Sequence, residues 1–137
     1  MEIPVIDKSN YLKGLLITAR KDNDLSESEK KIIRSIAERL GFASDFYEDT
    51  LKTLLANKYI LEDPIKFSNR KIAESFVTDG LKLAFSDKRE TNVEIDWLKK
   101  TAGTNDLNEE WFNKKLNECR DSSNPLSAKD FALLSII

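Results

Sequence analysis

The side chains with the clearest potential for chemistry are two pairs of carboxylates with the same spacing. Asp22 is followed seven residues later by Glu29, and Asp87 is followed seven residues later by Glu94. We expect each Asp near the end of one helix and each Glu in the first turn of the next. A carboxylate at a helix C-terminus faces the negative end of the helix dipole, and a bound cation would offset this unfavourable interaction. Because carboxylate oxygens suit hard cations, the four residues are candidate metal ligands for Ca²⁺, Mg²⁺ or Mn²⁺.

The same residues have an alternative explanation that needs no metal. In a capping box, the side chain of a Ser or Thr accepts a hydrogen bond from a backbone amide in the first turn of the helix. The side chain of a Glu three residues later accepts one from the backbone amide of that Ser or Thr. Glu29 follows Ser26 at this spacing, and Glu94 follows Thr91. The two aspartates would then be turn residues that bond neighbouring backbone groups.

An EF-hand is excluded by the spacing. Residues 22–26 begin like its calcium-binding loop, which requires Gly at the sixth position and Glu at the twelfth. Those positions hold Glu27 and Ile33 here, and the twelfth residue counted from Asp87 is Leu98.

The composition excludes most other catalytic and metal sites. The 137 residues contain no histidine and one cysteine, Cys119, which rules out a Ser-His-Asp or Cys-His site, a zinc finger and a disulfide within the chain. An enzyme would have to rest on carboxylates in opposed environments, of which the sequence shows no sign, so we expect no enzymatic activity and no catalytic residue. Cys119 follows Leu116 at helical spacing and is predicted to be a small core residue. Trp97 and Trp111 are predicted to lie in the core or at its rim.

The charge pattern argues against two classes of partner. The formal net charge is −2, and the basic residues are scattered among acidic ones, so we expect no nucleic-acid binding. No stretch approaches the roughly 20 consecutive apolar residues of a membrane span, and residues 1–7 lack the pattern of a secretory signal. The chain is therefore predicted to be cytoplasmic, with no direct membrane span.

The elements that must position these residues are helices. Apolar residues recur at spacings of three and four, and the chain has only 4 glycines and 3 prolines, a pattern typical of an all-α bundle. We predict a single domain over residues 1–137 with about seven helices, including a C-terminal helix at about 127–136 that closes the core. Gly80 falls inside the predicted fourth helix, where we expect either a close crossing with another helix or a bend.

An internal repeat divides this domain. Shifting the chain by 65 positions aligns five identical pairs, and it also aligns the two capping boxes. The identical pairs are Leu16 with Leu81, Ala19 with Ala84, Asp22 with Asp87, Glu29 with Glu94, and Ala37 with Ala102. This self-similarity predicts two pseudo-symmetric helix-turn-helix halves, at about 10–57 and 68–120.

The motif around the first turn resembles the TerB family of tellurite-resistance proteins. The family has a helix ending in Ala, an Asp-Gly turn, and a Glu seven residues after the Asp, followed by a Leu-x-x-Ile-Ala-x-x-Leu-Gly run. The matching stretches are Leu16-Ile-Thr-Ala-Arg-Lys-Asp22-Asn-Asp-Leu-Ser-Glu-Ser-Glu29 and Ile33-Arg-Ser-Ile-Ala37-Glu-Arg-Leu40-Gly41. The glycine of the motif is Asn23 here and Lys88 in the second half, and the resemblance covers roughly residues 10–120.

The resemblance implies an all-α, two-half fold and a non-catalytic role in stress response of the tellurite-resistance type. It also implies a divalent-metal site at Asp22, Glu29, Asp87 and Glu94. Related domains form the N-terminal part of membrane-anchored DnaJ-like co-chaperones, so the implied partners are proteins, membrane-associated ones among them. The alternative function is a protein-interaction module with no metal site.

Overall fold

The structure, a computed structural model, describes residues 2–20, 27–56, 63–85, 92–121 and 132–136. Within these ranges the chain is all-helical, which confirms the predicted fold class. Its α-helices are α1 (Val5–Arg20), α2 (Glu27–Arg39), α3 (Ser44–Ala56), α4 (Arg70–Ala84), α5 (Asn92–Thr104) and α6 (Glu109–Asp121). A short 3-10 helix, η2, spans Ala132–Ser135.

Two ends of the chain differ from the helices predicted there. α1 begins at Val5, ahead of the first predicted half at about 10–57, and its first two residues, Val5 and Ile6, are exposed. Of the predicted C-terminal helix at 127–136, residues 127–131 lie outside the described ranges, and the remainder forms η2.

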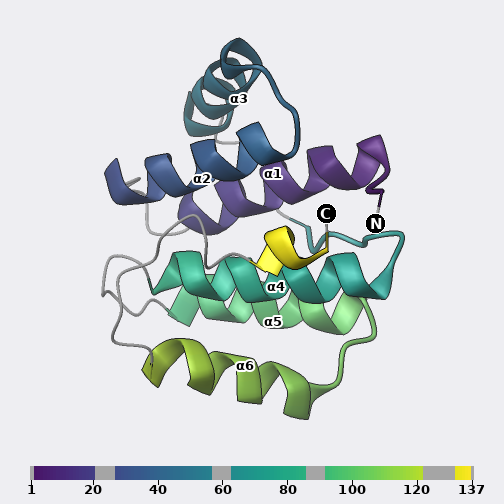
Figure 1. The fold of residues 1–137 in the computed structure, drawn as a ribbon. Coiled ribbons are helices and arrows are strands. Elements are labelled where there is room, and N and C mark those ends of the chain that lie inside the picture. Colours follow the sequence, from purple (N-terminus) through teal and green to yellow (C-terminus); the bar gives the residue numbers. More distant parts are fainter. Residues whose placement is uncertain (1, 21–26, 57–62, 86–91, 122–131, 137) are drawn as a thin grey trace.

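The α1–α4 pair forms the centre of the bundle (Figure 1). α2 and α3 pack against α1, and α5 and α6 pack against α4. The segment η2 lies on α4. α1 therefore contacts both α4 and α5, and these contacts join α1–α3 to α4–α6.

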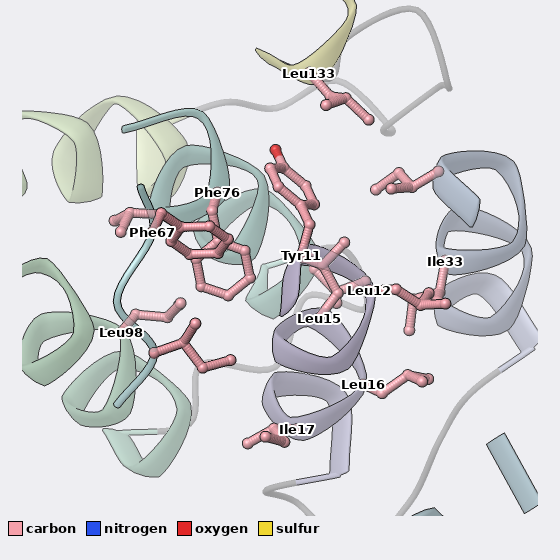
Figure 2. Packing of buried hydrophobic residues seen from close by; sticks show 14 of the residues in the cluster. Tyr11, Leu12, Leu15, Leu16, Ile17, Ile33, Phe67, Phe76, Leu98 and Leu133 are labelled. Atoms are coloured by element: carbon pink, nitrogen blue, oxygen red, sulfur yellow. The ribbon is translucent and has the colours of Figure 1, made fainter. Parts of the chain in front are cut away.

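The core fills the space between these helices (Figure 2). The rings of Tyr11, Phe67 and Phe76 pack together with centroids 5.1–6.1 Å apart, while Leu12 and Leu15 of α1 point toward Ile33 of α2. Burying aromatic and aliphatic side chains in this way supplies most of the stability of a domain of this size.

Two glycines allow close approaches in this core. A Cβ on Gly14 would lie 2.4 Å from Cζ of Phe76, and a Cβ on Gly80 would lie 2.5 Å from Cδ2 of Leu98. The second contact joins α4 to α5, so of the two alternatives expected at Gly80, a close crossing or a bend, the structure shows a close crossing.

α2 and α5 end with the same set of backbone hydrogen bonds. The amide of Phe42 donates to the carbonyl of Ala37, and the amide of Leu107 donates to the carbonyl of Ala102, each at 3.0 Å. A hydrogen bond from an amide to the carbonyl five residues earlier is typical of a Schellman motif. In this motif the residue before the donor has a left-handed backbone conformation. Adding 65 to the bounds of α2 gives those of α5, and adding 65 to the bounds of α3 gives those of α6.

Candidate functional site

The two predicted glutamates occupy the same place in their helices. Glu29 is the third residue of α2 and Glu94 is the third residue of α5. Both are buried, at 1% and 2% exposed. Figure 1 shows that α2 and α5 begin on the same side of the molecule, on the left of the view. The two helices that carry these glutamates therefore begin on the same side of the molecule.

The burial of these glutamates fits the capping explanation. Glutamate is almost never fully buried unless it is paired, and both Glu29 and Glu94 have a polar or electrostatic partner. Position three of a helix is also where a capping box places its Glu. The predicted ligands Asp22 and Asp87 lie outside the described residues, as do Ser26 and Thr91. In the part of the chain that is described, no three His, Cys, Asp or Glu side chains come together as a metal site.

A second polar group, which the sequence analysis did not predict, lies between α1 and α4. Asp79 and Ser75 of α4 are 0% and 4% exposed, and Tyr11 of α1 is 0% exposed. The Tyr11 hydroxyl lies 2.8 Å from Oγ of Ser75 and donates a hydrogen bond to Oδ2 of Asp79. We call these three residues the Asp79 cluster.

The Asp79 carboxylate also binds the C-terminal segment. Its Oδ1 accepts a hydrogen bond from the amide of Ala132 at 2.6 Å, and its Oδ2 accepts one from the amide of Leu133 at 3.2 Å. The side chain of Leu133 is buried and lies beside Tyr11 in the core (Figure 2). One carboxylate thus connects α1, α4 and η2.

The surroundings of Asp79 change its acidity. Burial raises the pKa of the Asp79 carboxyl from 3.8 to about 6. The hydrogen bonds from Tyr11, Ala132 and Leu133 and the charge of Lys82 act in the opposite direction. Burial and the neighbouring Asp79 raise the pKa of Tyr11 well above its usual value. At pH 7 the cluster therefore consists of a mostly ionised carboxylate that a neutral phenol and two amides solvate.

The position of Asp79 in α4 is the signal that could have revealed this cluster. Ile72, Phe76 and Leu83 belong to the buried face of α4, and Ser75 and Asp79 fall on the same face. A carboxylate within an apolar stripe must find partners when the helix is buried. The sequence alone could therefore have indicated a buried polar site at Asp79. It could not have identified the partners at residues 132 and 133.

Two other buried polar residues connect helices to the segment before α4. Asp7 accepts hydrogen bonds from the backbone amide of Ser68, at 3.1 Å, and from its hydroxyl. Asn105 accepts from the amide of Phe67 at 2.8 Å and donates to the carbonyl of Ile65 at 2.7 Å. Their polar atoms are occupied by these contacts, so we assign both residues a structural role.

The two tryptophans lie as predicted, whereas the cysteine is less buried than the predicted core position. Cys119 is half-buried against the core, and burial raises the pKa of its thiol, so it is not an activated nucleophile. Trp97 is buried in the core, with its ring 6.2 Å from that of Phe76 and nearly perpendicular to it, and Trp111 is half-buried at the rim.

Comparisons with known proteins identify no relative. No protein-family model matches the chain, and no curated protein or solved structure is similar to it. Among the described residues, no helix combines the length and the apolar character needed to cross a lipid bilayer.

Proposed function

We propose that the chain consists of two related three-helix units, α1–α3 and α4–α6. Matching helix bounds support this proposal, and so do the matching hydrogen bonds at the ends of α2 and α5. Bonds outside those helices repeat as well: the Tyr47 amide donates to the carbonyl of Ala43, and the Phe112 amide donates to the carbonyl of Asn108. Equivalent donors and acceptors are 65 positions apart in each case.

We propose further that the protein is a non-catalytic binding domain of the TerB type that takes up a divalent cation at its inter-helix turns. What supports this proposal is the equivalent placement of Glu29 and Glu94, each the third residue of its helix, together with the spacing of 65 that also pairs Asp22 with Asp87. In this account Asp22 and Glu29, with Asp87 and Glu94 in the second unit, supply the oxygen ligands.

The Asp79 cluster is enclosed within the protein and is not part of the proposed binding site. A carboxyl with a raised pKa in a buried site is a candidate acid or base. Here, however, η2 covers Asp79, and both carboxylate oxygens accept hydrogen bonds from within the protein. A group enclosed in this way has no oxygen directed at a substrate.

Glu29→Gln tests cation binding without removing the cap. A capping box accepts Gln as well as Glu, so the variant keeps the helix start but loses the ligand charge. Calorimetric titration with Ca²⁺, Mg²⁺ and Mn²⁺ should show binding to the wild type, and Glu29→Gln or Asp22→Asn should weaken or abolish it. Glu38→Gln, an exposed substitution on the same helix, serves as the control and should bind normally. Equal binding by Glu29→Gln and the wild type, or no binding by the wild type, would refute the cation site.

The second candidate function is protein interaction, which an exposed aromatic side chain on α3 favours. Phe46 is 49% exposed, and its ring stacks on the half-buried ring of Phe42 with centroids 5.1 Å apart. Aromatic side chains that are rigidly held and exposed are typical anchors of protein interfaces.

A substitution at Phe46 tests this interaction role better than removal of the C-terminus. Deleting residues 126–137 would take Leu133 out of the core and two donors away from Asp79. Phe46→Ser, in contrast, changes an exposed side chain. A partner that binds the wild type and the exposed-site control Lys52→Ser, but is lost with Phe46→Ser, would support the interaction surface. A partner that binds all three proteins equally would rule out this face of α3.

A further inference from the structure

The C-terminal segment, residues 132–136, has a counterpart in the first half of the chain. Phe67 and Ser68, just before α4, stand 65 positions ahead of Ala132 and Leu133, which is the spacing that relates the two three-helix units. In each place two consecutive backbone amides donate hydrogen bonds to buried side chains. The two segments therefore occupy comparable places, each following the third helix of its unit.

The two central helices contact each other reciprocally beside these segments. The ring of Phe76 on α4 approaches Gly14 of α1, and the hydroxyl of Tyr11 on α1 donates to Asp79 of α4. Tyr11 and Phe76 are 65 positions apart, and so are Gly14 and Asp79. Each helix thus presents its ring to the same position of the other, which is the pattern of a two-fold interface between identical subunits.

The segment before α4 is held from several elements. Asn105, after α5, accepts a hydrogen bond from the amide of Phe67 and donates one to the carbonyl of Ile65. Asp7 of α1 accepts from both the amide and the hydroxyl of Ser68. Because α4 begins directly after this segment, the segment cannot leave its place without disturbing the central helix.

The C-terminal segment is held at a single side chain. The amides of Ala132 and Leu133 donate to the two carboxylate oxygens of Asp79, at 2.6 and 3.2 Å. The side chain of Leu133 is buried beside Tyr11 (Figure 2), whereas Ile136 is half-buried. The contacts of this segment are therefore concentrated at one small site, the Asp79 cluster, and a chain segment can leave such a site without disturbing the six α-helices.

We propose that two copies of this chain exchange residues 132–136, so that the segment of each copy docks at the Asp79 cluster of the other. The segment seated at this cluster is the chain's own, and every copy carries both the segment and the site. Reciprocal exchange therefore gives a closed two-fold dimer in which the amide bonds to Asp79 and the burial of Leu133 are re-formed. The proposal is independent of cation binding.

Two complementary variants of the full chain test the exchange. Leu133→Asp disables the segment and leaves the site intact, because an unpaired carboxylate is strongly disfavoured in the core beside Tyr11. Asp79→Asn disables the site and leaves the segment intact, because the amide side chain has one acceptor oxygen for two backbone amides. Sedimentation velocity should show a one-to-one complex in an equimolar mixture, at a concentration where each variant alone is monomeric.

Asp96→Asn is the matched control, because it makes the same chemical change at an exposed carboxylate. Its segment stays at its own intact site, which a tethered segment occupies with an effective concentration of about a millimolar. Mixed with Leu133→Asp, it should therefore form less complex than Asp79→Asn does. Folded variants that do not associate, or equal association of Leu133→Asp with Asp79→Asn and with the control, would overturn the proposal.

The wild type decides the matter even if a variant fails to fold. Exchange requires the segment to leave its site while the helices stay folded, so hydrogen exchange should give the Leu133 amide a larger opening constant than the amides of Ser68 and Val77. A wild-type dimer should also appear as the protein concentration approaches about a millimolar. Equal opening constants for Leu133 and Val77, or a monomer throughout this range, would overturn the proposal.

Discussion

Gly41 and Asp106 have the same backbone conformation at the ends of two helices, 65 positions apart in the sequence. Both have a positive φ, of 91° in Gly41 and 59° in Asp106. The amide of Gly41 donates to the carbonyl of Glu38 at 3.0 Å, and the amide of Asp106 donates to the carbonyl of Gly103 at 3.1 Å. Glycine adopts this left-handed conformation at no steric cost, whereas a residue with a Cβ is strained in it. The two helix ends thus share one geometry but differ in how well their residues suit it.

Gly41→Ala is expected to destabilise the protein by about 1–2 kcal/mol, because alanine is strained in the left-handed region. A Cβ at this position would meet no atom within 4 Å, so the cost is one of backbone conformation alone. Gly103→Ala is the matched control, since a Cβ there also meets nothing but the residue is helical. It should stabilise the protein by up to about 1 kcal/mol. Urea unfolding measures both changes, and a loss of stability with Gly103→Ala would contradict the argument.

Asp106→Gly should raise the free energy of unfolding by about 0.5–1 kcal/mol, because glycine relieves the left-handed strain. The substitution also removes an ion pair with Lys66, but its atoms are 4.0 Å apart and both side chains are exposed. Exposed pairs of this kind contribute little to stability. A decrease in the urea midpoint would show that the Asp106 side chain has a stabilising contact that outweighs the strain.

Gly14→Ala should destabilise the protein by about 1–3 kcal/mol, because its Cβ would overlap the buried ring of Phe76. The ring is 0% exposed and packs against Tyr11, so it has little room to move. A smaller side chain should relieve the overlap. The double variant Gly14→Ala with Phe76→Leu should therefore lose less stability than the sum of the two single variants. Strict additivity in this double-mutant cycle would mean that α1 and α4 do not approach each other closely at Gly14.

Asp79 should make the protein less stable as the pH rises. The pKa of its carboxyl is raised in the folded state to about 6, so the folded state binds more protons than the unfolded state between about pH 4 and pH 6. This stabilisation is fully present below the unfolded pKa and is lost as the pH rises through about 6. Relative to Asp79→Asn, the wild type should lose about 1.4 kcal/mol between pH 5 and pH 7.5. Urea unfolding of both proteins at each pH measures this difference, and a constant difference would show that Asp79 titrates normally.

The helices could be predicted from the sequence because their signals are local. Apolar spacing, few glycines and capping residues predicted the all-α class. Gly80 indicated either a close crossing or a bend, and the structure shows a crossing in which Leu98 approaches Gly80. The first turn of α4 depends on Asn69, whose side chain accepts a hydrogen bond from the amide of Lys71 at 2.7 Å. The second predicted half begins at about residue 68, close to this cap.

The Asp79 cluster was not predicted because its partners are far apart in the sequence. Tyr11 precedes Asp79 by 68 residues, and Ala132 follows it by 53. An aspartate in an apolar stripe indicates a buried partner but not its identity. The candidate metal site, unlike the Asp79 cluster, was predicted from local spacing. Its two glutamates lie at equivalent positions in their helices, and cation binding remains a prediction.

The most direct test of the proposed function is thermal unfolding of the full chain, first with EDTA and then with Ca²⁺, Mg²⁺ or Mn²⁺ added in turn. A cation that binds the folded state alone, at 100 times its dissociation constant, should add about 2.7 kcal/mol and raise the Tm by several degrees. We predict a saturable increase with one of the three cations that is lost in Asp22→Asn and in Glu29→Gln. An unchanged Tm with all three cations would contradict the proposal and leave Glu29 and Glu94 as helix caps.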